Sequence, residues 1–92
     1  MFVGLFVSVL DEDAKHKVAK IVINYGFKKI QDDLFESYSI REKDLNKLKV
    51  DIAPFLSYDD QVRFYQYPIE NGFKVTVYKE RKWKRLSFKS DH

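Results

Sequence analysis

The chain has 92 residues, of which 45% are hydrophobic and 34% charged, and its formal net charge is +3. This length and composition predict one globular domain and exclude a disordered chain. There is no cysteine, which excludes a disulfide scaffold, thiolate metal sites and a cysteine nucleophile, and the two histidines, His16 and His92, leave almost nothing from which to build a histidine metal cage or a Ser-His-Asp triad.

The first element is a near-continuous apolar run at residues 2–10, which predicts a central strand buried on both faces. The run is far shorter than the roughly 20 apolar residues of a membrane-spanning helix. No basic segment precedes it, and the acidic residues Asp11, Glu12 and Asp13 follow it, so it does not have the form of a signal peptide. We therefore expect a cytoplasmic protein with no membrane partner.

Two amphipathic helices are predicted next. In the first, capped by Asp11 or Asp13 and ended by Gly26, one face carries the apolar residues Ala14, Val18, Ile21, Val22 and Tyr25. Residues 27–38 predict one or two extended segments with a turn at residues 32–33. For the second helix, Ser39 and Glu42 have the spacing of a capping box, and the apolar face comprises Leu45, Leu48, Ile52 and Phe55.

The remaining segments predict strands. Apolar and polar residues alternate over residues 60–67 and 73–78, and residues 83–88 add a further short extended segment. The resulting order predicts an α+β, ferredoxin-like βαββαβ sandwich with an extra C-terminal strand, in which both helices cover one face of the sheet and the other face stays open. We expect residues 1–78 to form the ferredoxin-like domain and residues 79–92 a basic C-terminal extension, either an edge strand or a partner-docking segment.

The charge is distributed unevenly along the chain. Residues 1–72 carry ten Lys/Arg and twelve Asp/Glu, a net charge of −2, whereas residues 73–92 carry seven and two, a net charge of +5. A basic block that contains aromatic residues is typical of phosphate binding. It is equally typical of an edge strand kept soluble by lysine and arginine, and the sequence leaves both interpretations open.

Four kinds of chemistry are compatible with these elements. Aromatic strands suggest an RNA-recognition module, but the second motif lies on the wrong strand of that topology. Ser8 ends the first strand but has no general base nearby in the sequence. The acidic triplet is a candidate site for a hard cation, although the sequence favours capping of the first helix and complementation of its dipole. A basic dimer that holds a nucleic-acid backbone is the fourth.

The combination of motifs resembles a known family. An apolar strand ends in an acidic turn, a basic helix follows at residues 15–20, and residues 26–36 have the pattern G-F-x-x-I-Q-x-x-L-F-E. Residues 60–65 then begin a later strand. This arrangement resembles the small CRISPR-associated adaptation proteins of the Cas-two family, over residues 1 to about 78.

The resemblance implies a homodimer that binds double-stranded DNA or RNA and bridges the Cas-one integrase during spacer acquisition. Many members are described as Mg²⁺-dependent endonucleases, an activity that depends on an aspartate at the end of the first strand, in a Tyr-Asp pattern. Here Val7 and Ser8 occupy that position, and Ser8 supplies no carboxylate. We therefore expect nucleic-acid binding without catalysis.

The alternative within the family is a metal-dependent endonuclease that uses Asp11, Glu12 and Asp13 with Mg²⁺, and a further alternative is a ferredoxin-like regulatory or toxin-like protein unrelated to CRISPR. The predicted nucleic-acid-binding residues are Lys15, Lys17, Lys20, Lys28, Lys82, Lys84 and Arg85. The predicted partner-docking residues are Trp83, Leu86 and Phe88, which serve equally well to cover this chain's own sheet edge.

Overall fold

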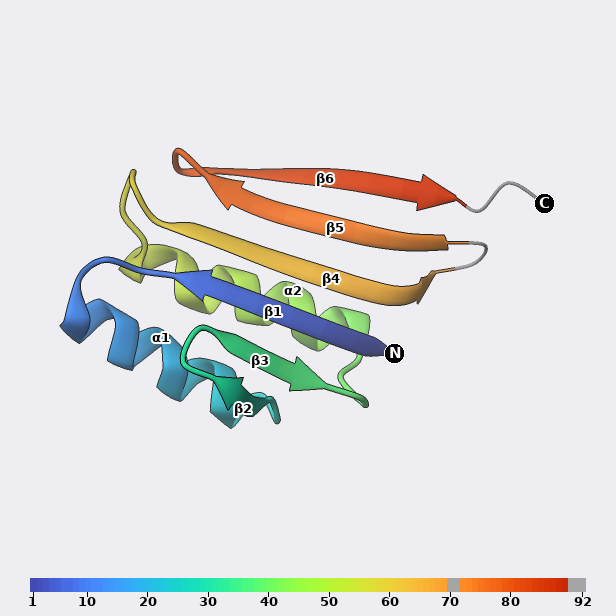
Figure 1. The fold of residues 1–92 in the computed structure, drawn as a ribbon, viewed down its shortest axis with the longest axis horizontal. Helices are drawn as coiled ribbons and strands as arrows, with labels where there is room; N and C mark the ends of the chain where they lie inside the picture. The colour runs from blue at the N-terminus through green and yellow to red at the C-terminus, as the bar shows by residue number, and fades with distance from the viewer. Residues whose placement is uncertain (70–71, 90–92) are drawn as a thin grey trace.

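The computed structural model describes residues 1–69 and 72–89, and the side chains of residues 1–67 and 72–86. It contains an antiparallel sheet of six strands in the order β2-β3-β1-β4-β5-β6, with two helices on one side (Figure 1). The elements are β1 (Phe2–Ser8), α1 (Glu12–Asn24), β2 (Lys28–Gln31), β3 (Leu34–Ser37), α2 (Glu42–Ile52), β4 (Gln61–Ile69), β5 (Gly72–Lys79) and β6 (Lys82–Lys89). The predicted α+β, ferredoxin-like fold is confirmed, and β5 and β6 extend its sheet beyond β4.

Strand β1 lies in the centre of the sheet, between β3 and β4. Val3 and Leu5 are fully buried against the helices, whereas Phe6, the next residue, is 46% exposed. The prediction that this strand is buried on both faces is therefore wrong. Successive side chains of a strand point to opposite faces, and the two helices cover only one of them. No helix in the described parts of the chain is long and apolar enough to cross a bilayer.

Helix α1 has the termini that its sequence predicts. The Asp11 carboxylate accepts a hydrogen bond from the Ala14 N–H at 2.9 Å and so caps the first turn. At the other end Gly26 has a φ of +93°, which a residue with a side chain rarely adopts. The Phe27 N–H bonds to the Val22 carbonyl and the Gly26 N–H to that of Ile23, so the helix ends in a Schellman motif.

Helix α2 begins later than the capping-box prediction. Its N-cap is Arg41, which makes no side-chain capping bond, and Glu42 is the first helical residue. Ser39 instead donates its N–H to the Ser37 hydroxyl oxygen at 3.4 Å, within the connection from β3. The Arg41 side chain pairs with Asp44 at 3.0 Å across the first turn. The capping box is therefore wrong, because this connection holds Ser39 outside the helix.

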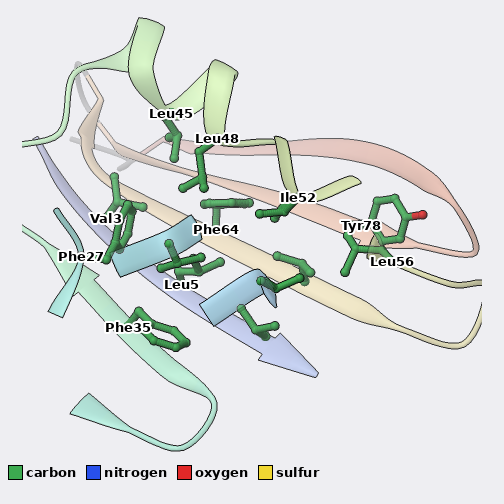
Figure 2. Close-up of a cluster of buried hydrophobic side chains, with 14 of the residues drawn as sticks. Val3, Leu5, Phe27, Phe35, Leu45, Leu48, Ile52, Leu56, Phe64 and Tyr78 are labelled. Carbon is green, nitrogen blue, oxygen red and sulfur yellow. The ribbon is translucent and has the colours of Figure 1, made fainter. Parts of the chain in front are cut away.

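One hydrophobic core joins the helices to the sheet (Figure 2). Leu45, Leu48 and Ile52 of α2 are fully buried, as the helical spacing predicts. They pack over the helix-facing side chains of the sheet, among which Phe64 of β4 is also fully buried. Phe55 is 36% exposed because it lies in the 3₁₀ turn Ala53–Phe55, whose tighter winding takes it off the apolar face of α2.

Strands β5 and β6 form a long hairpin at the edge of the sheet opposite β2 (Figure 1). Lys79 pairs with Lys82, so the connection has two residues, Glu80 and Arg81, with φ values of 53° and 61°. Two positive φ values in a two-residue hairpin loop are the signature of a type I′ turn, for which Asn-Gly is the preferred sequence. This turn therefore places two exposed, charged residues on a backbone of defined conformation.

Candidate nucleic-acid interface

The face of the sheet that the helices leave uncovered carries two kinds of residue. Strand register places Phe6 opposite Arg63, Arg63 opposite Val77, and Val77 opposite Lys84. Directly opposed residues share a face, and the neighbouring Val62 and Phe64 point into the core, so this row points away from the helices. Aromatic side chains and cations thus lie on the same open face.

The exposed aromatic side chains on this face form the surface that we call the aromatic face. Its members and their exposed fractions are Phe6 (46%), Tyr65 (40%), Tyr67 (59%) and Phe73 (42%). Phe2 lies opposite Tyr67 and packs its ring against Tyr38 at a centroid distance of 5.2 Å. Soluble monomers rarely expose a contiguous apolar surface of this kind, so the aromatic face is a candidate protein interface.

A second feature lies at the β5–β6 turn. It is a groove of about 630 Å³, here called the basic groove, lined by Tyr58, Arg63, Val77, Lys79, Glu80, Lys82, Trp83, Lys84 and Leu86. Val77 and Leu86 contribute apolar surface, and four of the lining residues are cations. A groove of this size has the volume of a typical small-molecule site.

The described residues do not neutralise the cations of the basic groove. None of Arg63, Lys79, Lys82 and Lys84 makes an ion pair with any residue that the structure describes. The single carboxylate of the groove, Glu80, accepts a hydrogen bond from the Tyr58 hydroxyl at 2.6 Å. This bond, and the negative charge beside it, raise the pKa of the Tyr58 hydroxyl. The groove therefore presents an excess of positive charge.

The structure brings some of the predicted nucleic-acid-binding residues together. Lys82 and Lys84 both line the basic groove. Arg85 does not, because it lies opposite Thr76 on the helix-facing side of β6. On that side Arg85 and Lys74 lower the pKa of Lys49 of α2, because they place like charges near its ammonium group. Burial of Lys49 is the larger cause of the lowered pKa.

The predicted cations of the N-terminal half lie elsewhere. The Lys15 ammonium pairs with Asp33 at 3.4 Å, and the Lys17 ammonium lies 5.8 Å from the centre of the Phe55 ring. Lys20 is exposed on α1, and Lys28 is on β2, at the sheet edge opposite β6. Within one chain, therefore, none of these four cations lines the basic groove.

The predicted docking residues behave differently from one another. Trp83 is half-buried, with its ring centroid 4.9 Å from that of Tyr78 and 5.9 Å from that of Phe64. It thus packs on this chain's own core, which is one of the two roles that the sequence left open. Leu86 is 45% exposed and lines the basic groove. The side chain of Phe88 lies outside the described residues.

The position at which the family resemblance implies a metal-binding aspartate lies at the end of β1. Ser8 is exposed there and is opposite Gln61, which is in turn opposite Lys79, and Lys79 is opposite Lys82. Mg²⁺ prefers carboxylate ligands, and this row offers a hydroxyl, an amide and two cations. These residues do not fit a magnesium ion.

The acidic triplet also does not form a metal-binding cluster. Asp11 is engaged in capping α1, and Glu12 and Asp13 occupy the first helical turn, where negative charge complements the helix dipole. In the parts of the chain that the structure describes, no three His, Asp or Glu side chains lie together in an arrangement suited to a metal ion.

Five of the residues that line the basic groove are not among the predicted site residues: Tyr58, Arg63, Val77, Lys79 and Glu80. For Arg63 a signal was present, because its alternation with the buried Val62 and Phe64 places it on the open face. For Tyr58 and Glu80 the sequence held no signal, because they are 22 residues apart and only the folded hairpin brings them together.

Comparison with known protein families gives a match. The family model described as CRISPR associated protein Cas2, which corresponds to the Cas-two family, matches residues 7–75. Comparison with curated proteins gives no match, and comparison with solved structures gives none. The family match begins at the end of β1 and extends into β5, so it includes both helices and the strands β2, β3 and β4 of the ferredoxin-like order. On this match over most of its length, the chain belongs to the Cas2 family of CRISPR-associated proteins.

Proposed function

We propose that this protein is a homodimeric, nucleic-acid-binding component of CRISPR adaptation that bridges the Cas-one integrase during spacer acquisition and does not itself cleave nucleic acid. The observation that carries the nucleic-acid part is the basic groove, where four cations have no ion-pair partner among the described residues. Unpaired lysine and arginine side chains on an open surface bind phosphates and release counterions. The groove contacts the sugar-phosphate backbone, which positions a duplex without reading its sequence.

The aromatic face supports the dimer. Its exposed rings are central in the sheet, on β1, β4 and β5, and a second copy of the same face covers them in a two-fold arrangement. Phe2 and Tyr67 lie at the end of the sheet opposite to the row of Ser8, Lys79 and Lys82. This end of the aromatic face is therefore remote from the basic groove, whereas Phe6 and Tyr65 adjoin the groove: Phe6 lies opposite Arg63, whose guanidinium donates a hydrogen bond to the Tyr65 hydroxyl at 3.2 Å.

Nucleic-acid binding is tested by fluorescence anisotropy with labelled duplex DNA and duplex RNA over a series of salt concentrations. The Lys82→Ala/Lys84→Ala variant removes two groove cations, and we expect weaker binding and a salt dependence reduced by about two units of log–log slope. The matched control is Lys43→Ala/Lys47→Ala, which removes two exposed lysines of α2. Lys17→Ala/Lys20→Ala tests the predicted α1 residues in the same assay.

The outcomes separate the alternatives. An equal loss of duplex affinity in the groove variant and the α2 control would mean that binding depends only on net charge, and would contradict a site at the groove. Mg²⁺-dependent cleavage by the wild-type protein that is lost in Asp11→Ala/Glu12→Ala/Asp13→Ala would establish the endonuclease instead. A pull-down with the integrase encoded beside the repeat array tests the bridging role, and failure to recover it would remove that part of the proposal.

The dimer is tested by sedimentation equilibrium. Tyr67→Glu places a charge in the aromatic face, where the tyrosine is 59% exposed, and we expect a monomer. The matched control is Ile23→Glu, which puts the same charge on a residue of α1 that is 49% exposed. A wild-type protein that is monomeric at micromolar concentration would contradict the proposed dimer.

A further inference from the structure

The basic groove contains one carboxylate, and the fold restrains it. Glu80 is the first residue of the two-residue turn between β5 and β6, where its φ of 53° fixes the backbone tightly. The carboxylate accepts the hydrogen bond from the Tyr58 hydroxyl at 2.6 Å and makes no ion pair with a described residue. Lys79 and Lys82, which flank the two-residue turn, make no ion pair with a described residue although they line the same groove.

The tyrosine that engages Glu80 is itself held in place. Tyr58 lies in the connection between α2 and β4, next to Ser57. The Ser57 N–H and hydroxyl both donate to the buried Asp60 carboxylate, at 2.7 and 3.0 Å. The Tyr58 hydroxyl is therefore presented from a fixed loop to a fixed turn, which lowers the entropic cost of the hydrogen bond.

From this geometry we infer that Tyr58 is a positioning residue, which holds the Glu80 carboxylate away from the lysines of the basic groove and so keeps the groove free to bind a phosphodiester backbone. The inference rests on the proposed nucleic-acid binding. Without the hydroxyl, a carboxylate in a groove with four cations pairs with one of them and competes with the phosphates. The tyrosine thus acts on the ligand through Glu80 and not by contact.

A double-mutant cycle tests this inference, with anisotropy of labelled duplex DNA at constant low salt as the readout. Tyr58→Phe deletes only the hydroxyl and should weaken binding about threefold, whereas Glu80→Gln removes the competing charge and should leave binding as tight as in the wild type or tighter. In the Glu80→Gln background, Tyr58→Phe should have no effect, because no carboxylate remains to be released. The difference caused by Tyr58→Phe should also disappear at high salt.

The matched control is Tyr25→Phe. Tyr25 also donates its hydroxyl to a carboxylate, that of Asp51 at 2.5 Å, but this pair joins the two helices and does not line the groove. We expect it to leave DNA binding unchanged. Thermal unfolding of each variant confirms that the protein remains folded, which is expected for Tyr58→Phe because that side chain is 54% exposed.

Two results would overturn the inference. If Tyr58→Phe weakens duplex binding by the same factor in the wild-type protein and in the Glu80→Gln variant, the hydroxyl contacts the ligand itself. If Tyr58→Phe binds like the wild type, the hydrogen bond has no part in binding. Failure of the wild-type protein to bind any duplex would instead refute the proposed function, so the two failures are distinguishable.

Discussion

The carboxylate of Asp60 accepts a hydrogen bond from the backbone N–H of Leu10 at 3.0 Å, although the two residues are 50 positions apart. The Asp60 side chain is 1% exposed, and its other oxygen accepts both bonds from Ser57. A single buried carboxylate thus joins the connection after β1 to the loop that carries Tyr58. The Asp60 carboxylate thus holds the C-terminal end of β1 beside the N-terminal end of β4.

Asp60→Ala should therefore destabilise the fold by about 3 kcal/mol, because it removes three charge-assisted hydrogen bonds and leaves two backbone N–H groups without their acceptor. Urea denaturation measures the change in the free energy of unfolding. The control is Asp59→Ala, whose neighbouring carboxylate is exposed and whose loss should change stability by less than about 0.5 kcal/mol. Equal effects of the two substitutions would show that Asp60 is not a structural link.

Arg81→Gly should stabilise the protein by about 1 kcal/mol. Arg81 has a φ of 61° at the second turn position, where glycine avoids the steric cost that a Cβ atom imposes. Gly26→Ala makes the opposite change, at a residue where φ is +93° and the added Cβ would meet no atom within 4 Å. It should lower the stability by a similar amount, through backbone strain alone. Thermal or urea unfolding of both variants checks the prediction, and a loss of stability in Arg81→Gly would contradict the type I′ turn.

Lys49→Met should raise stability slightly near pH 7, by less than about 1 kcal/mol because the ammonium group is partly solvated. Burial, Arg85 and Lys74 lower the Lys49 pKa in the folded state below its ordinary value of 10.5. Between the two pKa values the unfolded chain binds more protons, so the stability of the wild-type protein rises with pH in that window as the charge is lost. The advantage of the variant should consequently shrink as the pH approaches 10.5.

Urea denaturation of Lys49→Met and of the wild type at neutral pH and near pH 10 measures this difference. Subtracting the two free energies of unfolding at each pH cancels the contribution of tyrosine titration, which both proteins share. Lys47→Met, at an exposed lysine of the same helix, is the control. A difference that grows with pH would contradict the lowered pKa of Lys49.

Ser8→Asp introduces a carboxylate at the position where the family resemblance implies one. We expect this change to weaken duplex binding without producing Mg²⁺-dependent cleavage, because the row that contains Ser8 continues through Gln61 to Lys79 and Lys82. An isolated carboxylate near these cations forms an ion pair in preference to a metal site. Assays on labelled RNA and duplex DNA with Mg²⁺ or Mn²⁺ check it, with Ser8→Asn as the uncharged control. Metal-dependent cleavage by Ser8→Asp alone would show that only the carboxylate was missing.

The local elements could be predicted from the sequence because their signals lie within a few residues. Helical spacing identified Val18 and Val22 of α1, both fully buried, and Gly26 marked the end of that helix. Alternation identified β4 and β5, and the order of elements identified the fold class. The capping box at Ser39 failed because the connection from β3, a tertiary constraint, fixed where α2 begins.

By itself the sequence determined the order of helices and strands, the open sheet face, the basic C-terminal segment and the family motif, all of which depend on local spacing and composition. Only the tertiary structure decided which charges act together. It buried Asp60 and left Asp59 exposed, separated Lys15 from Lys82, and brought Tyr58 to Glu80. Strand register and burial determine the distances between residues that are far apart in the chain, and electrostatic interactions depend on those distances.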